Sequence, residues 1–160
     1  MSRKFGVLIA AHGNLAEAAL ESLEMLTGHQ ENIETVGIFP GMGRGEMRAA
    51  IEKKLELLAG CQGILIAADL VGGTPANVAA ELAARPPEGK GLPELYLAAG
   101  VNMAFLCELT SMEDLNDAVM DELTEAGRFG LQNLGEKARS LGGSGIDGGK
   151  QYIPLDVNDL

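Results

Sequence analysis

Residues 63–80 read GILIAADLVGGTPANVAA, and this stretch decides the fold. Its first six residues are apolar without alternation, which is typical of a strand buried on both faces of a parallel sheet. A glycine-rich loop follows, and Pro75 then stands where the first turn of a helix tolerates proline. The sequence therefore predicts a strand, a tight loop and a helix in direct succession, which is the βα unit of an α/β fold.

The same alternation of apolar runs and amphipathic segments extends along most of the chain. Near-continuous apolar runs predict three more buried strands, at residues 5–11, 34–39 and 94–98. Segments with apolar residues at spacings of three and four predict helices between them. These helices are expected around residues 15–26, 47–58, 75–84, 102–109 and 112–126. We therefore expect an open, doubly wound α/β sheet of about four mostly parallel strands in the order 2-1-3-4, with helices on both faces.

Local signals predict where several of these helices begin or end. Asn14 is expected to cap the first helix, with Glu17 completing a capping box. Thr74 is expected to be the N-cap of the helix that begins at Pro75. Gly127 resembles a helix C-cap, and residues 129–134 are expected to form a further short strand or helix.

Length and composition predict one soluble globular domain. The 160 residues suffice for a domain at residues 1–141, followed by a glycine-rich C-terminal tail at residues 142–160. Hydrophobic residues make up 46% and charged residues 22%, as in folded proteins generally. Twelve Lys and Arg against 23 Asp and Glu give a net charge of -11. That sign argues against a nucleic-acid partner and disfavours anionic membrane surfaces.

The cysteines and the N-terminus favour a cytoplasmic protein. Cys61 and Cys107 lie far apart in apolar stretches, which is typical of reduced core cysteines and not of a disulfide framework or a zinc ribbon. The first apolar run is too short for a signal peptide, and no stretch approaches membrane-spanning length. Residues 91–127 contain no Lys or Arg, and their acidic side chains predict a solvated helix face rather than a metal site.

Two polar residues follow the first and third predicted strands. His12 comes directly after the first strand and Asp69 directly after the third. In the order 2-1-3-4 these strands are neighbours, so the two side chains are expected side by side at the edge where open α/β sheets bind ligands. A carboxylate that accepts a hydrogen bond from one imidazole nitrogen fixes the tautomer and leaves the other nitrogen free to attack. The alternatives are a core histidine and a turn carboxylate, but a strand end before Gly-Asn is a surface position.

The loop after the third strand predicts an anion site. Gly72, Gly73 and Thr74 precede a helix start, where free backbone N–H groups attract phosphate. An ordinary glycine-rich turn before a well-capped helix is the simpler alternative. The sequence contains neither a P-loop nor GxGxxG after the first strand, and neither a nucleophile elbow nor a metal cluster is visible. Covalent phosphohistidine chemistry on His12 fits this set best, while His29 is expected to be a surface residue.

Four stretches that include these residues also resemble a known family. VLIAAHG at residues 7–13, ESLEMLTG at 21–28, ILIAADLVGGTPANVAA at 64–80 and AGVNMAFLCEL at 99–109 are similar to the enzyme IIA domain of the mannose/fructose/sorbose class of the bacterial phosphoenolpyruvate-dependent sugar phosphotransferase system. The resemblance covers roughly residues 5–135. It implies a cytoplasmic phosphotransferase without cofactor or metal, with His12 phosphorylated, Asp69 beside it, and Gly72, Gly73 and Thr74 in the phosphate loop.

The resemblance also implies partners. The donor would be a small histidine-containing phosphocarrier protein, the acceptor a IIB protein or domain, and the membrane sugar permease complex would be served indirectly. A homodimer is implied as well, and an edge strand after Gly127 would be the candidate for exchange between subunits. Two alternatives remain at this point. They are a non-catalytic module that binds a small anion or nucleotide, and the related dihydroxyacetone-kinase phosphocarrier subunit.

Overall fold

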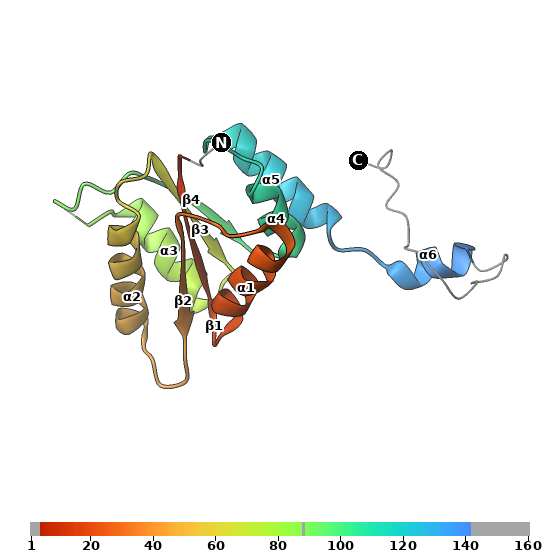
Figure 1. The fold of residues 1–160 in the computed structure, drawn as a ribbon. Coiled ribbons are helices and arrows are strands. Elements are labelled where there is room, and N and C mark those ends of the chain that lie inside the picture. Colours follow the sequence, from red (N-terminus) through yellow and green to blue (C-terminus); the bar gives the residue numbers. More distant parts are fainter. Residues whose placement is uncertain (1–3, 88, 142–160) are drawn as a thin grey trace.

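The sheet has four strands and is parallel throughout. The computed structural model describes residues 4–87 and 89–141. Its strands are β1 (Gly6–His12), β2 (Ile33–Ile38), β3 (Gly63–Ala68) and β4 (Glu94–Ala99). They are ordered β2-β1-β3-β4, and every neighbouring pair is parallel (Figure 1). The predicted α/β fold and strand order are confirmed, and β1 and β3 are the two central strands.

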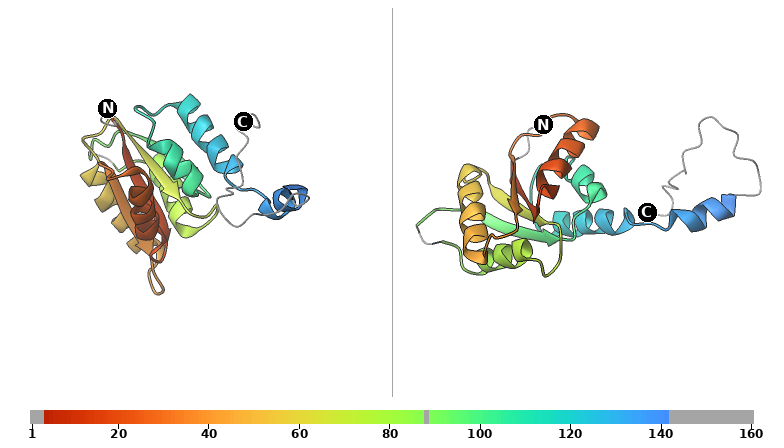
Figure 2. Two further views of the ribbon diagram at one scale, coloured as in Figure 1. Left: turned by 45° about the vertical axis from the view of Figure 1, so that its right-hand side comes forward. Right: turned by 90° about the horizontal axis from the view of Figure 1, so that it is seen from below.

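Helices cover both faces of the sheet. They are α1 (Leu15–Thr27), α2 (Arg44–Leu57), α3 (Thr74–Ala84), α4 (Met103–Leu109), α5 (Asp117–Phe129) and α6 (Leu134–Leu141). Buried side chains of α1, α4 and α5 form one apolar layer, and those of α2 and α3 form the other. The two layers lie on opposite sides of the sheet in Figure 2, as a doubly wound fold requires.

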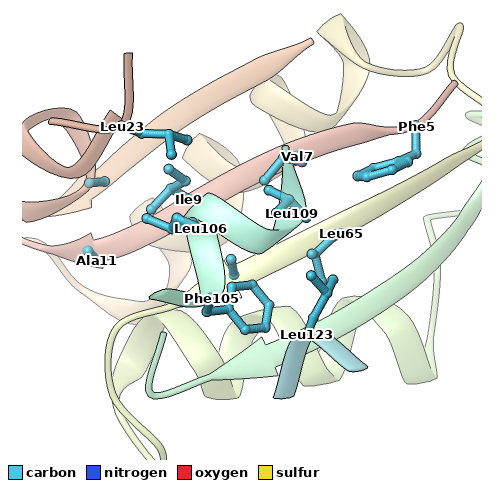
Figure 3. Packing of buried hydrophobic residues seen from close by; sticks show 12 residues of the cluster. Phe5, Val7, Ile9, Ala11, Leu23, Leu65, Phe105, Leu106, Leu109 and Leu123 are labelled. Carbon is cyan, nitrogen blue, oxygen red and sulfur yellow. The ribbon is translucent and has the colours of Figure 1, made fainter. Parts of the chain in front are cut away.

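The central strands alternate between the two layers. On β1, Val7 and Ile9 pack with α1 and α4, whereas Leu8 and Ala10 pack with α2 and α3. Figure 3 shows Val7 and Ile9 beside Leu106 and Leu109 of α4. Because each successive side chain enters a different apolar layer, the whole strand must be apolar. This burial explains the unbroken apolar runs in the sequence.

Two predictions about helix ends need correction. Asn14 is the N-cap residue of α1, as predicted, but it has φ −87° and ψ 6° and makes no side-chain capping bond, so the expected capping box with Glu17 is absent. Gly127 does not end a helix, since α5 continues to Phe129. A Cβ on Gly127 would lie 3.4 Å from Phe105 Cβ, an ordinary contact distance, so Gly127 is an interior residue of α5 that faces α4.

The third helix starts one residue earlier than predicted. Gly73 is its N-cap and Thr74 its first helical residue, so Thr74 is not the cap. This shift brings the start of α3 closer to the glycine pair of the loop.

The chain beyond α5 leaves the body of the domain. Residues 130–133 connect α5 to α6, and no strand follows β4 within residues 4–87 and 89–141. The expected extra edge strand is therefore not formed there. Helix α6 extends away from the sheet and the other helices in Figures 1 and 2. The predicted tail at residues 142–160 lies outside the described residues.

Candidate active site

His12 stands at the exposed end of a buried strand. It is the last residue of β1 and the only exposed one on that strand, with 47% of its side chain accessible. The register of β1 with β3 pairs Ala10 with Ala68. Asp69 is the next residue after β3, so the topology places it beside His12 at the carboxyl edge of the sheet.

The carboxylate of Asp69 binds His12 through two groups. His12 Nδ1 lies 2.9 Å from Asp69 Oδ2 and 3.2 Å from Oδ1. The backbone N–H of His12 also donates to Asp69 Oδ2 at 3.0 Å. An ionised carboxylate only accepts hydrogen bonds, so the neutral imidazole carries its proton on Nδ1 and leaves the Nε2 lone pair free. The predicted pairing of these two residues is confirmed in its geometry.

The glycine loop before α3 closes against the imidazole. Gly72 has φ +78°, a conformation that favours glycine. Gly73 has φ −67°, which any residue can adopt, but a Cβ there would lie 2.9 Å from His12 Cε1. Gly73 is therefore required for close approach to His12, whereas Gly72 is required for the turn.

The first turn of α3 supplies donors beside this contact. Helix geometry leaves the first N–H groups without partners inside the helix. Gly73 donates to Leu70 O and Pro75 has no N–H, which leaves the N–H groups of Thr74 and Ala76 for a ligand. The N-terminal end of the helix dipole adds a partial positive charge. His12 thus lies against both Asp69 and Gly73, and Thr74 is the next residue of the same loop.

Two residues that support the site were not predicted. A Cβ on Gly37 of β2 would collide with the carbonyl oxygen of Gly13, so Gly37 lets the turn after His12 pass over β2. Asn77 donates from its side-chain amide to Gly72 O at 2.9 Å. The sequence signal for Asn77 is its place in the first turns after the glycine pair, but the bond depends on a loop conformation that the sequence does not reveal.

Apolar side chains surround the polar site. Leu15, Phe39, Leu70 and Val71 all follow the carboxyl ends of strands, and each is exposed by 44% to 74%. A hollow of about 230 Å³ opens beside Asp69, lined mainly by apolar residues of β1, α1 and α4. Exposed apolar side chains gathered in this way are typical of a surface that receives another protein.

His29 lies outside the site, as predicted. It follows the end of α1, at the opposite edge of the sheet from His12. Its side chain is 81% exposed, and its Nδ1 lies 2.7 Å from Glu24 Oε1. The backbone N–H of Gln30 holds the pKa of the Glu24 carboxyl below its usual value, and the hydrogen bond from His29 adds to this. His29 therefore makes a solvent-exposed contact with Glu24 in the loop after α1.

The remaining candidate features are metal clusters, membrane-spanning helices and cysteines. Within residues 4–87 and 89–141, no three His, Cys, Asp or Glu side chains gather in a way that would hold a metal ion. In the same part of the chain, no helix combines the length and the apolar character needed to cross a bilayer. Cys61 and Cys107 are thiols and are only partly buried.

Comparison with known proteins gives one consistent set of relatives. Residues 6–126 match the family model described as the PTS system fructose IIA component. The mannose-specific EIIAB component of Escherichia coli is 31% identical over 135 residues, which is 82% of this chain and 40% of that protein. The fructose-specific EIIA component of Bacillus subtilis is 31% identical over 108 residues, which is 68% of this chain and 70% of that protein. This chain therefore spans less than half the length of the E. coli relative.

Solved structures agree in fold. The PTS IIA protein associated with the fucose utilization operon of Streptococcus pneumoniae superposes with a TM-score of 0.72 at 27% identity, covering 85% of this chain and 97% of that one. The mannose/sorbose-specific IIA subunit from Enterococcus faecalis superposes with a TM-score of 0.70, also at 27% identity, covering 83% and 95%.

Proposed function

Because the chain belongs to the EIIA family of the sugar phosphotransferase system, whose members are phosphotransferases, we propose that it is a phosphocarrier that accepts a phosphoryl group on His12. The observation that carries the proposal is the hydrogen bond between His12 Nδ1 and Asp69, which leaves Nε2 as the free nucleophile beside the start of α3. In this proposal the protein works in the cytoplasm and passes the phosphoryl group on to a second protein of the sugar-uptake system.

The proposed reaction is two successive displacements at phosphorus. The Nε2 lone pair of His12 forms a bond to phosphorus while the N–P bond of the donor's phosphohistidine breaks, and that electron pair returns to the donor imidazole. The acceptor then attacks the same phosphorus, and the Nε2–P bond of His12 breaks. Both steps balance without a nucleotide.

Asp69 has a defined task in this scheme. Attack by Nε2 leaves positive charge on the imidazole while Nδ1 keeps its proton. The carboxylate, only 12% exposed, stabilises that charge and holds the ring in one orientation. The effect is large because the carboxylate is already in place before the reaction.

The start of α3 is the proposed phosphate cradle. The transferring group spreads its charge over three equatorial oxygens, which need hydrogen-bond donors. The N–H groups of Thr74 and Ala76 and the hydroxyl of Thr74 are the candidates, and the missing Cβ of Gly73 provides the room.

The proposed partners are two proteins of the same system. The donor is the histidine-containing phosphocarrier protein, and the acceptor is a IIB protein or domain, which links this chain indirectly to the membrane sugar permease complex. The exposed apolar side chains of Leu15, Phe39, Leu70 and Val71 support a protein rather than a small molecule as the transfer partner.

We also propose a homodimer that uses the segment after α5. Edge strand β4 is partly exposed, and a hollow of about 550 Å³ lies over it, lined by β4, α4 and the end of α5. Leu131 is 85% exposed at the start of the outlying segment. A chain ending at Gly130 keeps α5 whole, and light scattering should show it as a monomer while the full chain is a dimer. A truncated chain that remains dimeric would place the main contact elsewhere.

Intact mass after phosphorylation tests the phosphocarrier proposal. The protein is incubated with phosphoenolpyruvate and the two general phosphotransferase proteins. We expect a mass increase of one phosphoryl group that is lost in acid and kept in base. A module that only binds an anion or nucleotide would show reversible binding and no adduct, and that result would overturn the proposal.

A further inference from the structure

We propose that Asn77 is a positioning residue for phosphoryl transfer, and that it acts by fixing the peptide group between Gly72 and Gly73. The inference rests on the proposed function of the same site. Asn77 lies in the second turn of α3, and its hydrogen bonds go to the glycine loop rather than to His12. Its side-chain amide donates to Gly72 O at 2.9 Å, and its backbone N–H donates to Gly73 O at 3.0 Å.

The peptide between the two glycines is held at both of its polar ends. Its carbonyl oxygen, on Gly72, accepts from the Asn77 side chain. Its N–H, on Gly73, donates to Leu70 O at 3.1 Å. Rotation of this peptide plane would break both bonds and would exchange the positions of the carbonyl and the N–H.

Such a rotation is easy for this pair of residues unless something prevents it. Rotation of the peptide plane changes ψ of Gly72 and φ of Gly73, which is now −67°, and a glycine adopts positive and negative φ with similar ease. Neither residue has a Cβ that would oppose the turn. The Asn77 side chain is the only bond to the carbonyl end from outside the loop among the described residues.

The orientation of this peptide sets the positions of Gly73 and of the Thr74 N–H. Gly73 lies against the imidazole, where a Cβ would be 2.9 Å from His12 Cε1. The next N–H belongs to Thr74, the first donor of the proposed cradle. A rotated peptide would move Gly73 relative to the imidazole and would shift the Thr74 N–H away from the position that the proposed cradle needs. Phosphoryl oxygens would then lose the first N–H donor of that cradle.

Asn77→Ala is the first test, because it removes the donor and leaves the helix intact. Alanine is the better helix former, so α3 is not weakened by the change. We expect the rate of His12 phosphorylation at saturating donor protein to fall about fivefold to tenfold, as for the loss of one hydrogen bond. The donor concentration at half-maximal rate should stay unchanged, since Asn77 is not one of the exposed apolar residues proposed to contact the donor protein. Asn77→Asp keeps the shape but faces Gly72 O with an acceptor, and it should be at least as slow.

Gln30→Ala is the matched control. The Gln30 side-chain amide also donates to a glycine carbonyl, Gly28 O, at 3.1 Å, and Gly28 also has a positive φ of 83°. This contact lies at the opposite edge of the sheet from His12, so its loss should leave the transfer rate unchanged.

Hydrogen exchange of the Gly73 amide separates this inference from the proposed function. In Asn77→Ala the amide should exchange about fivefold to tenfold faster, whether or not the protein carries phosphate. Faster exchange together with slower transfer supports the inference. Faster exchange with an unchanged transfer rate overturns the positioning role and leaves the phosphocarrier proposal standing. Unchanged exchange overturns it outright, and a wild-type protein that takes up no phosphate overturns the proposed function and this inference together.

Discussion

Gly73→Ala tests how closely the loop before α3 must approach His12. The new Cβ would lie 2.9 Å from His12 Cε1 and 3.2 Å from Leu70 O. Non-bonded carbon atoms rest about 3.5–4.0 Å apart, so the loop and the imidazole must separate by roughly 0.6–1.1 Å. The backbone adds no strain, because the φ of −67° at Gly73 suits alanine.

The imidazole of His12 is held in place and cannot move freely away from the new Cβ. Its Nδ1 lies 2.9 Å from Asp69 Oδ2, and Asp69 follows a fully buried strand. A displacement of about 1 Å at a reacting group lowers a rate by about 100-fold, so we expect phosphoryl transfer to fall by roughly tenfold to 100-fold. Crowding should lower the free energy of unfolding by about 1–2 kcal/mol.

Single-turnover phosphorylation by the phosphorylated donor protein, stopped by rapid quench, measures the rate, and urea denaturation measures stability. Gly28→Ala is the control, because Gly28 has φ +83° with no atom within 4 Å of a new Cβ. It should lose about 1–3 kcal/mol of stability through backbone strain and transfer phosphate normally. The reasoning fails if Gly73→Ala transfers phosphate at the wild-type rate, or if Gly28→Ala slows transfer equally.

Three further substitutions test the roles assigned to the other site residues. His12→Ala should fold and take up no phosphate by intact mass, while His29→Ala behaves as wild type; label retained in His12→Ala would contradict the assignment. Asp69→Asn should fold but transfer phosphate slower by roughly two orders of magnitude or more in rapid quench, because the amide can favour the wrong tautomer; unchanged kinetics would show that the residues are not coupled. Thr74→Ser should be nearly neutral and Thr74→Val about tenfold slower, because valine keeps the shape and removes the donor; equal rates would show that the hydroxyl takes no part in transfer.

The sheet could be predicted from the sequence because its central strands are buried on both faces. β1 and β3 send alternate side chains into two apolar layers, so their runs contain no polar residue until the sheet ends. The helices that cover the sheet could be predicted as well, because their apolar residues recur at spacings of three and four. The strand order followed from the usual handedness and neighbour rules for such sheets.

The ends of the helices were predicted less accurately than the strands, because tertiary contacts override local signals. Gly127 resembles a helix stop in its local sequence, yet α5 continues through it to Phe129, and Gly127 faces Phe105 of α4. Asn14 has the right chemistry for a cap, but the tight turn after His12 leaves it with φ −87° and ψ 6°, outside the extended conformation of a capping residue. Residues 129–134 offered no periodicity, and they end α5, form a connection and begin α6.

The two halves of the site differ in how firmly the fold determines them. His12 and Asp69 continue the two fully buried central strands, so their separation is fixed by the core, and the topology alone was enough to pair them. The loop from Leu70 to Thr74 is held by hydrogen bonds at the surface, among them the bond from Asn77 to Gly72 O. Opening such a loop costs far less than moving a core strand. Small perturbations should therefore act on the phosphate cradle first, while the pairing of the imidazole with the carboxylate persists until the core itself unfolds.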